Sequence, residues 1–405
     1  MTNGRDEIAQ IFDADNHYWE SSDAFTRFRD PKFAERGVQV KDVDGVSRYV
    51  LNGEVFQALP GPADVHPRPA PGSFMEYFAG RLSREDFLKS FNEAPADHPE
   101  YYDREARIGV MDAQGVEAMW MFPSQGVVLE APMLAVDVEA AIAVCTAFNR
   151  WIEDEWGFAY QDRIFGVPYL NMSDPDHLVD ELQWVLDHGA RVIAIRHGSA
   201  VTADGLRSPA DPMFDRFWGL AQESKVVVTS HDGSDMTYMP MYELLAKQWG
   251  QTPELEPGGG ENMRMMGGTV FSGLMKMRVV HDFAYMLVAH RLFERFPGLR
   301  VAYIENGGAW VPSMLQALEY LGHGGEYQSN PKDQFIEHCW VAPFVEESVD
   351  ELARFLPTDR ILFGSDWPHG EGFPAPKDFF DIIDNFSLDD QRRIMRENAH
   401  ELTFS

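Results

Sequence analysis

The feature that most constrains this chain is a regular alternation of short apolar segments with longer segments of helical spacing. The apolar segments are rich in branched and aromatic residues, and most of them end abruptly in charged or polar residues. Such segments are typical of parallel strands buried on both faces, with helices as the connections between them. The pattern predicts eight strands, at residues 8–12, 116–122, 164–170, 191–196, 225–230, 299–304, 337–343 and 360–365.

Eight strands separated by helices match the strand count of a closed barrel. We therefore predict an α/β fold, a distorted (β/α)8 TIM barrel formed by residues 1–405 as a single domain with insertions. A doubly wound open sheet is the alternative. That fold needs a glycine-rich phosphate loop after its first strand, whereas this chain has Asp13-Ala-Asp-Asn-His17 there.

Two stretches interrupt the alternation. Residues 21–105 are predicted to be an N-terminal insertion, because they alternate around Asp44-Gly45 as a β-hairpin does and then enter a proline-rich loop. Residues 234–268 follow the fifth strand and contain three consecutive glycines and many methionines. A long loop at this point is predicted to be a lid or a dimer arm.

The charge of the chain limits its partners. It has 65 acidic and 34 basic residues, a formal net charge of −31, whereas nucleic acids and anionic membranes are bound by basic surfaces. No apolar run reaches the roughly 20 residues of a membrane-spanning helix. Two cysteines are too few for a disulfide framework, and the first residues do not resemble a secretion leader. We expect a cytoplasmic protein that binds a small-molecule substrate.

Polar side chains gather where the predicted strands end. In a barrel the carboxyl ends of all strands meet at one mouth, so these side chains are expected to lie together. The set contains Asp13, Asp15 and His17 after the first strand, Arg196 and His197 after the fourth, Ser230, His231 and Asp232 after the fifth, Glu305 and Asn306 after the sixth, and Asp366 after the eighth.

Four of these residues predict a metal site. Asp15 and His17 lie two residues apart, so in an extended chain both side chains point to the same side. With His231 and Asp366 they offer two imidazole nitrogens and two carboxylate oxygens, a set that suits Zn²⁺ and also Mn²⁺ or Fe²⁺. Each has a structural alternative when taken alone: Asp366 as a helix cap, His17 as a turn residue, His231 as a core histidine. Their joint position favours one divalent metal ion.

The segments that carry these residues resemble the amidohydrolase superfamily. The resemblance is to the amidohydrolase-related branch that includes aminocarboxymuconate-semialdehyde decarboxylase and the γ-resorcylate and carboxyvanillate decarboxylases. It rests on Asp13-Ala-Asp-Asn-His17, Val228-Thr-Ser-His231, Ile304-Glu-Asn-Gly-Gly-Ala-Trp310 and Gly364-Ser-Asp-Trp-Pro368. It implies a distorted barrel with one catalytic metal, usually in a homodimer. By position it makes Asp15, His17, His231 and Asp366 the metal ligands, and gives Asp366 a role in proton transfer.

Glu305 departs from those decarboxylases, which carry histidine at this strand end. A glutamate that is anionic at neutral pH would repel a carboxylate bound at the metal, and it suits acid–base chemistry on a neutral substrate. A structural role, holding Arg196, His197 or a ligand histidine in place, is the alternative. The sequence leaves both roles open.

Other residues near the predicted mouth are candidates for substrate binding. The fork of Arg196 suits an anionic group of the substrate, and an ion pair with Glu305 or Asp13 is the alternative. His197 is a candidate substrate contact. An aromatic pocket wall is predicted from three tryptophans beside the site, with packing in the core or rim as the alternative: Trp19, Trp310 and Trp367.

These observations predict a metal-dependent enzyme. We expect a hydrolase that acts on an amide, ester or lactone of a small aromatic or cyclic substrate through metal-activated water, with Asp366 and Glu305 as catalytic residues. The alternative is a non-oxidative, metal-dependent decarboxylase of an aromatic or unsaturated carboxylic acid. A hydratase on the same scaffold is a third candidate.

Overall fold

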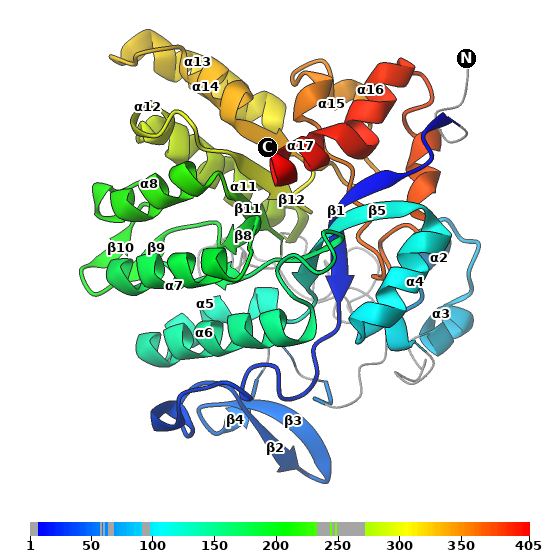
Figure 1. Ribbon diagram of the computed structural model, residues 1–405, viewed down its shortest axis with the longest axis vertical. Coiled ribbons are helices and arrows are strands. Elements are labelled where there is room, and N and C mark those ends of the chain that lie inside the picture. Colours follow the sequence, from blue (N-terminus) through cyan, green and yellow to red (C-terminus); the bar gives the residue numbers. More distant parts are fainter. Residues whose placement is uncertain are drawn as a thin grey trace.

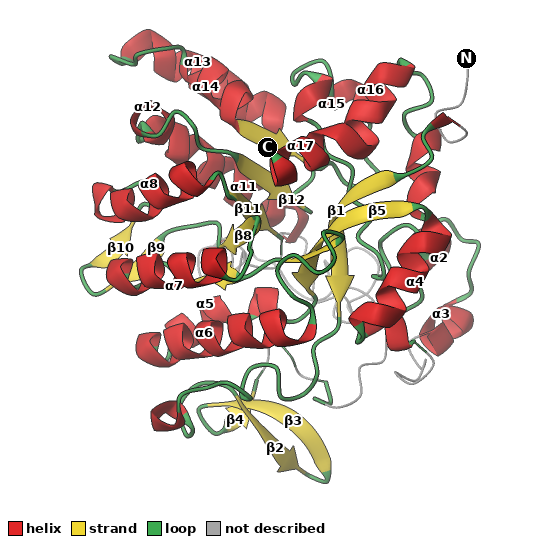
Figure 2. Ribbon diagram, viewed as in Figure 1, coloured by secondary structure: helices red, strands yellow, loops and turns green. Residues whose placement is uncertain are grey.

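A barrel of parallel strands lies at the centre of the molecule, and helices surround it. The computed structural model describes residues 7–56, 59, 61–63, 69–90, 98–232, 244, 248 and 272–405. Strands occupy the interior of this part of the chain and helices its outside (Figure 2). The strands of the barrel are β1 (Ile11–Tyr18), β5 (Val116–Pro123), β6 (Ile164–Gly166), β7 (Tyr169–Leu170), β8 (Val192–Ile195), β11 (Val227–His231), β12 (Val301–Ile304) and β13 (Cys339–Val341).

Hydrogen bonds join these strands into two parallel sheets that meet at both ends. One sheet has the order β1-β5-β6 and the other the order β13-β12-β11-β8-β7. β6 and β7 are consecutive pieces of one extended segment, interrupted at Val167 and Pro168, so they connect the sheets on one side. The connection is continuous because Val167 N donates to Met121 O and Ala194 N to Pro168 O.

The segment 361–367 closes the barrel on the other side. Leu362 N donates to Val341 O of β13, while Ala14 N of β1 donates to Phe363 O. Further along, Asp366 N donates to Asp15 O and His17 N to Trp367 O. The eighth predicted strand therefore lies between β13 and β1, and the predicted (β/α)8 barrel fold is confirmed.

The bounds of the first and last strands differ from the prediction. The first strand was expected at residues 8–12, with the acidic residues beyond its end, but β1 runs from Ile11 to Tyr18 and contains them. Pairing with the neighbouring barrel strands keeps the backbone extended through this polar stretch. The last segment makes only isolated bridges, because the N–H of Phe363 donates to Ile394 O in a π-helical turn, Arg393–Glu397. The hydrogen bond to this turn replaces one that Phe363 would make to a neighbouring strand.

The helices follow the strands in the alternating order that the sequence predicts. Their bounds are α4 (Arg104–Gln114), α5 (Glu130–Leu134), α6 (Val138–Glu155), α7 (Pro175–Asp187), α8 (Asp215–Ser224), α11 (Ser272–Ala289), α12 (Leu292–Arg295), α13 (Val311–Gly324), α14 (Pro331–His338), α15 (Val349–Leu352), α16 (Leu388–Arg392) and α17 (Asn398–Phe404). Local sequence sets several ends. Asp103 caps α4 by accepting from Ala106 N, and Gly115, at φ 73°, ends it in the left-handed conformation that glycine adopts easily.

The N-terminal insertion contains a small antiparallel sheet and two short helices. β2 (Gln39–Val43) and β3 (Val46–Leu51) form the predicted hairpin, with Asp44 and Gly45 both at positive φ, and β4 (Glu54–Val55) joins its edge. This sheet projects from the lower end of the molecule (Figure 1). Helices α2 (Ser73–Phe78) and α3 (Arg84–Ser90) pack against each other through Phe74, Tyr77 and Phe87. The predicted lid or dimer arm at 234–268 lies outside the described residues, apart from residues 244 and 248.

Apolar side chains fill both sides of the strands. Inside the barrel, residues such as Phe12, Trp120, Phe165 and Leu362 form one cluster, while the larger core lies between strands and helices. Cys145 and Cys339 are both buried and free. None of the helices in the described ranges combines the length and the apolar character that crossing a membrane requires.

Candidate metal centre

Five side chains from four strand ends converge at the mouth of the barrel. Asp15 and His17 come from β1, His231 is the last residue of β11, Glu305 follows β12, and Asp366 follows Ser365 of the closing segment. Nε2 of His17 lies 3.3 Å from Asp15 Oδ1 and 3.2 Å from Asp366 Oδ1. Nε2 of His231 lies 3.3 Å from the same Asp15 oxygen and 3.4 Å from Glu305 Oε2. The structure thus brings together all four predicted ligands and Glu305.

These separations match the spacing between ligands of one ion. Metal–ligand distances of about 2.1 Å give edges of roughly 3.0–3.4 Å between neighbouring ligands. The side chains of Asp15, His17, His231 and Asp366 are buried, and neither ring nitrogen of His17 has a hydrogen-bond partner among the described residues. Buried polar atoms without partners are costly, and a cation between them removes that cost. The donor set therefore fits a divalent ion.

The second ring nitrogen of His231 also supports metal binding. Its Nδ1 lies 2.9 Å from the carbonyl oxygen of Asp232, which can only accept a hydrogen bond. Nδ1 therefore donates to this carbonyl, and Nε2 is directed toward the carboxyl groups of Asp15 and Glu305. Histidines that ligate metals are oriented in this way by a backbone carbonyl. The ring of Phe122, 4.5 Å from that of His231 between centroids, covers the apolar side.

Asp366 also contacts His369, three residues later. His369 Nδ1 lies 2.7 Å from Asp366 Oδ1, and its ring stacks on His17 with centroids 3.9 Å apart. On the other side His369 Nε2 lies 2.8 Å from the hydroxyl oxygen of Ser124, which donates to Tyr18 O. Since the serine proton is used there, His369 donates from Nε2. This contact fixes the orientation of the His369 ring beside Asp366.

The two carboxyl groups at the centre have opposite pKa shifts. Burial favours the neutral form of Asp366, but His369 and His17 outweigh it and hold the pKa well below its usual value. Burial raises the pKa of Glu305 well above its usual value, and the nearby Asp366, Asp232 and Asp15 raise it further. The shifts favour the anionic form of Asp366 and the protonated form of Glu305.

Backbone strain coincides with these two residues. Glu305 has φ 53° and Asp366 has φ 55°, in the left-handed region that side-chain-bearing residues rarely adopt. Such strain persists only where the surroundings hold it, and it concentrates at functional sites. At both strand ends it turns a carboxyl group toward the other ligands.

At Gly364 the backbone of the closing segment passes close to β1, which the absence of a side chain allows. A β-carbon at this position would lie 2.5 Å from Cβ of Asp15. We expect Gly364→Ala to push the segments apart, lower the free energy of unfolding by about 1–3 kcal/mol and reduce the bound metal per chain. Urea unfolding and metal analysis measure both effects.

Gly109 provides the matched control. It lies in α4, and a β-carbon there meets nothing within 4 Å. Gly109→Ala is expected to raise the free energy of unfolding by about 0.5–1 kcal/mol and to leave metal content unchanged. A Gly364→Ala protein with wild-type stability and metal content would contradict the close approach.

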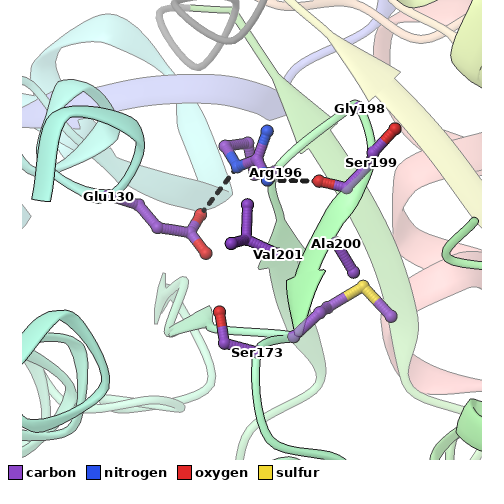
Figure 3. A pocket seen from close by; sticks show the side chains of 8 residues that line it. Glu130, Ser173, Arg196, Gly198, Ser199, Ala200 and Val201 are labelled. Carbon is purple, nitrogen blue, oxygen red and sulfur yellow. Dashed lines mark hydrogen bonds and ion pairs between the residues drawn. The ribbon is translucent and has the colours of Figure 1, made fainter. Parts of the chain in front are cut away.

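Arg196 has a different partner from the ones the sequence suggested. Its Nε faces Glu130 Oε2 at 3.4 Å, and a terminal nitrogen donates to Ser199 O (Figure 3). The proposed partners Glu305 and Asp13 belong instead to the metal cluster and to a bond with Ser365. The other Glu130 oxygen accepts from Asn171 at 2.7 Å, so this buried pair is anchored on two sides. Burial raises the pKa of Glu130, and Arg196 opposes that shift.

The remaining predicted residues lie in three different places. Trp19 and Trp367 form a cluster with Tyr101 beside His369, close to the candidate metal centre. Trp310 instead packs against Tyr303 in the main core, which agrees with the packing alternative. His197 Nδ1 lies 2.9 Å from the hydroxyl of Ser230, and burial lowers the pKa of His197 to about 4, so the ring is neutral at pH 7.

Several residues around the centre were not identified from the sequence. Glu130 follows a short helical turn after β5, and Arg107 lies in α4, so neither belongs to a strand end or motif. Asn16 and Ser365 lie inside the motifs that carry the ligands. Their position next to Asp15, His17 and Asp366 could have identified them from the sequence.

Comparisons with known proteins identify the family. The family model described as amidohydrolase matches residues 12–402. An amidohydrolase from Mycobacterium avium subsp. paratuberculosis K-10 is 34% identical, with a TM-score of 0.85, over 97% of this chain and 99% of that one. No curated protein matches the sequence significantly. The chain belongs to the amidohydrolase family, and it is a metal-dependent enzyme of that class.

More distant solved structures share the fold. A dihydroxybenzoic acid decarboxylase from Polaromonas sp. JS666, solved with bound manganese and an inhibitor, is 16% identical and has a TM-score of 0.59, over 97% of this chain and 96% of that one. The 5-carboxyvanillate decarboxylase from Sphingomonas paucimobilis is 15% identical and has a TM-score of 0.57, over 98% and 99%.

Proposed function

We propose that the protein is a hydrolase that acts on an amide, ester or lactone of a small aromatic or cyclic molecule. The observation that carries this proposal is the pair Asp366 and Glu305, two carboxyl groups at one centre with opposite pKa shifts. A pair of this kind supplies a base and an acid at the same pH. Hydrolysis needs both, because water must lose a proton and the leaving group must gain one.

Asp15, His17, His231 and Asp366 are the proposed ligands of one divalent ion, with Zn²⁺ the best match and Mn²⁺ or Fe²⁺ the alternatives. When bound, such an ion polarises a carbonyl group and makes water nucleophilic at neutral pH. Asp366 accepts a proton from the attacking water. Glu305 donates a proton to the nitrogen or oxygen that leaves, as the bond from that atom to the carbonyl carbon breaks and the bond from water forms.

The surroundings support a substrate without a carboxylate at the reacting centre. Arg196, the cation suited to receive a carboxylate, faces Glu130 instead. The rings of Trp19 and Trp367, beside His369, offer an apolar face to an aromatic or cyclic group. We propose these two residues, rather than Trp310, as substrate contacts.

Non-oxidative decarboxylation is the second candidate. The upward shift of the Glu305 pKa is consistent with it, because this shift favours the protonated form, which does not repel a substrate carboxylate and can protonate the carbon that loses CO₂. Decarboxylases of dihydroxybenzoic acid and 5-carboxyvanillate share the fold.

A substrate panel on protein of known metal content separates the two reactions. We expect acid release from aryl esters, anilides or lactones, and no CO₂ release from hydroxybenzoates. Chelation should abolish the activity, and the added divalent ion should restore it. Release of CO₂ from a hydroxyaromatic acid, with no turnover of esters, amides or lactones, would establish the second candidate and overturn the first.

A further inference from the structure

Arg107 is a buried cation for which the proposed reaction has no use. Its side chain has no exposed surface, and among the described residues no carboxylate lies within ion-pair distance of it. Its Nε donates to Glu100 O at 2.8 Å, one terminal nitrogen donates to His17 O at 2.8 Å, and the other to Asn16 Oδ1. The guanidinium lies 4.5 Å from the ring centre of Trp367. A buried charge of this kind requires compensation.

Asn16 connects Arg107 to the buried carboxyl group of Asp13. The amide oxygen of Asn16 accepts from Arg107, and its nitrogen donates to Asp13 Oδ2 at 2.9 Å. The opposite amide orientation would place NH₂ against the guanidinium, so the contacts fix the assignment. An amide thus bridges a buried guanidinium and a buried carboxyl group.

Asp13 extends the connection to the closing segment. Its carboxylate accepts from the backbone N–H of Ser365 at 2.9 Å and from the Ser365 hydroxyl. It also accepts from Asp15 N at 3.2 Å. The chain Arg107–Asn16–Asp13–Ser365 therefore passes directly behind three candidate ligands, since Asn16 lies between Asp15 and His17 and Ser365 precedes Asp366.

The local backbone explains why such a connection is needed. Between Asp13 and Asn16, β1 advances three residues while β5 advances from Met119 to Met121, so β1 carries one extra residue. A bulge of this kind weakens the ladder where the ligands stand. Side-chain hydrogen bonds to this stretch compensate in part for the backbone hydrogen bonds that the bulge removes.

We propose that Arg107 is a positioning residue, which holds the β1 ligands and the Asp366 segment in register for metal binding. It touches neither metal nor substrate, and it acts through Asn16, Asp13 and the carbonyl of His17. Residues that orient ligands from behind contribute about 10–100-fold to metal affinity. This inference rests on the proposed metal centre, and its test reads metal binding rather than turnover.

The experiment measures the affinity of wild-type protein and variants for Zn²⁺ by competition with a chelator, and the visible spectrum of the Co²⁺ form. Arg107→Met is expected to lower the affinity about 10–100-fold and to alter the Co²⁺ spectrum. Arg107→Lys, which keeps the charge but not the fork, should recover part of the loss. Asn16→Leu removes the amide that bridges Arg107 and Asp13, together with its 3.5 Å contact to Ser365 Oγ. It provides the second test if Arg107→Met does not fold. In the double variant the losses should not add, because both remove one connection.

Arg150 is the matched control, since it is an arginine that pairs with Glu181 and lies 3.3 Å from the ring centre of Trp184, both on helix α7. Arg150→Met should lower the melting temperature but keep the metal affinity within about twofold of wild type. If Arg107→Met or Asn16→Leu loses only stability, with wild-type affinity and Co²⁺ spectrum, the inference is overturned. A wild-type protein that retains an ion yet hydrolyses none of the panel overturns the proposed function alone.

Discussion

Alanine in place of His231 is expected to yield a folded protein that retains no stoichiometric metal ion and has lost at least about 10³-fold in kcat/KM, which corresponds to about 4 kcal/mol. Nε2 of this ring faces Asp15 and Glu305 at 3.3 and 3.4 Å, so its removal opens one side of the donor set and leaves the carboxylates to repel one another. Metal analysis and steady-state kinetics on the hydrolysed substrate measure the effects.

His338 is the matched control for that experiment. It is buried at the end of α14, where Nδ1 lies 3.0 Å from Leu299 O and the ring stacks on Phe293. His338→Ala should reduce stability through lost packing and leave metal content unchanged. Wild-type metal content in His231→Ala would remove this residue from the ligand set.

The second large effect is expected for Glu305→Gln. The amide has nearly the shape of the acid but cannot transfer a proton, so hydrolysis should fall about 10²–10⁴-fold in kcat while bound metal remains. Measuring kcat and KM separately, with metal content, distinguishes a lost proton donor from a lost ligand.

A buried carboxylate outside the mouth serves as the comparison. Glu181 lies on α7 and pairs with Arg150 and Asn149. Glu181→Gln is expected to change stability but not kcat. If Glu305→Gln keeps full activity, Glu305 is a structural partner of His231, the role that the sequence also left open.

Much of the fold was predictable because it depends on local pattern. Alternating apolar and helical segments predicted the barrel. The abrupt change from apolar to polar residues placed His231, Glu305 and Asp366 at strand ends. The first strand was predicted too short, because β1 continues through Asp13-Ala-Asp-Asn-His17, a polar stretch with no apolar alternation. Tertiary hydrogen bonds to the closing segment, rather than β-propensity, hold that stretch extended.

The centre itself was predictable only in part. Spacing and strand ends indicated Asp15, His17, His231 and Asp366, since neighbouring strands determine which residues meet. The pairing of Arg196 with Glu130 was not predictable, because Glu130 comes from a segment with no regular relation to the strands. Homodimer formation, a cytoplasmic location and the single-domain organisation stay predictions.

The ligands on β1 and the ligand in the closing segment are far apart in the sequence. Asp13 and Ser365, which join them, are 352 positions apart. A nascent chain therefore cannot assemble the centre until the segment that carries Asp366 has been synthesised, and the ion can bind only after the barrel has closed. An ion that binds only the native form also stabilises that form. Metal uptake by this protein should thus report the last stage of its folding, the joining of its first strand to its last.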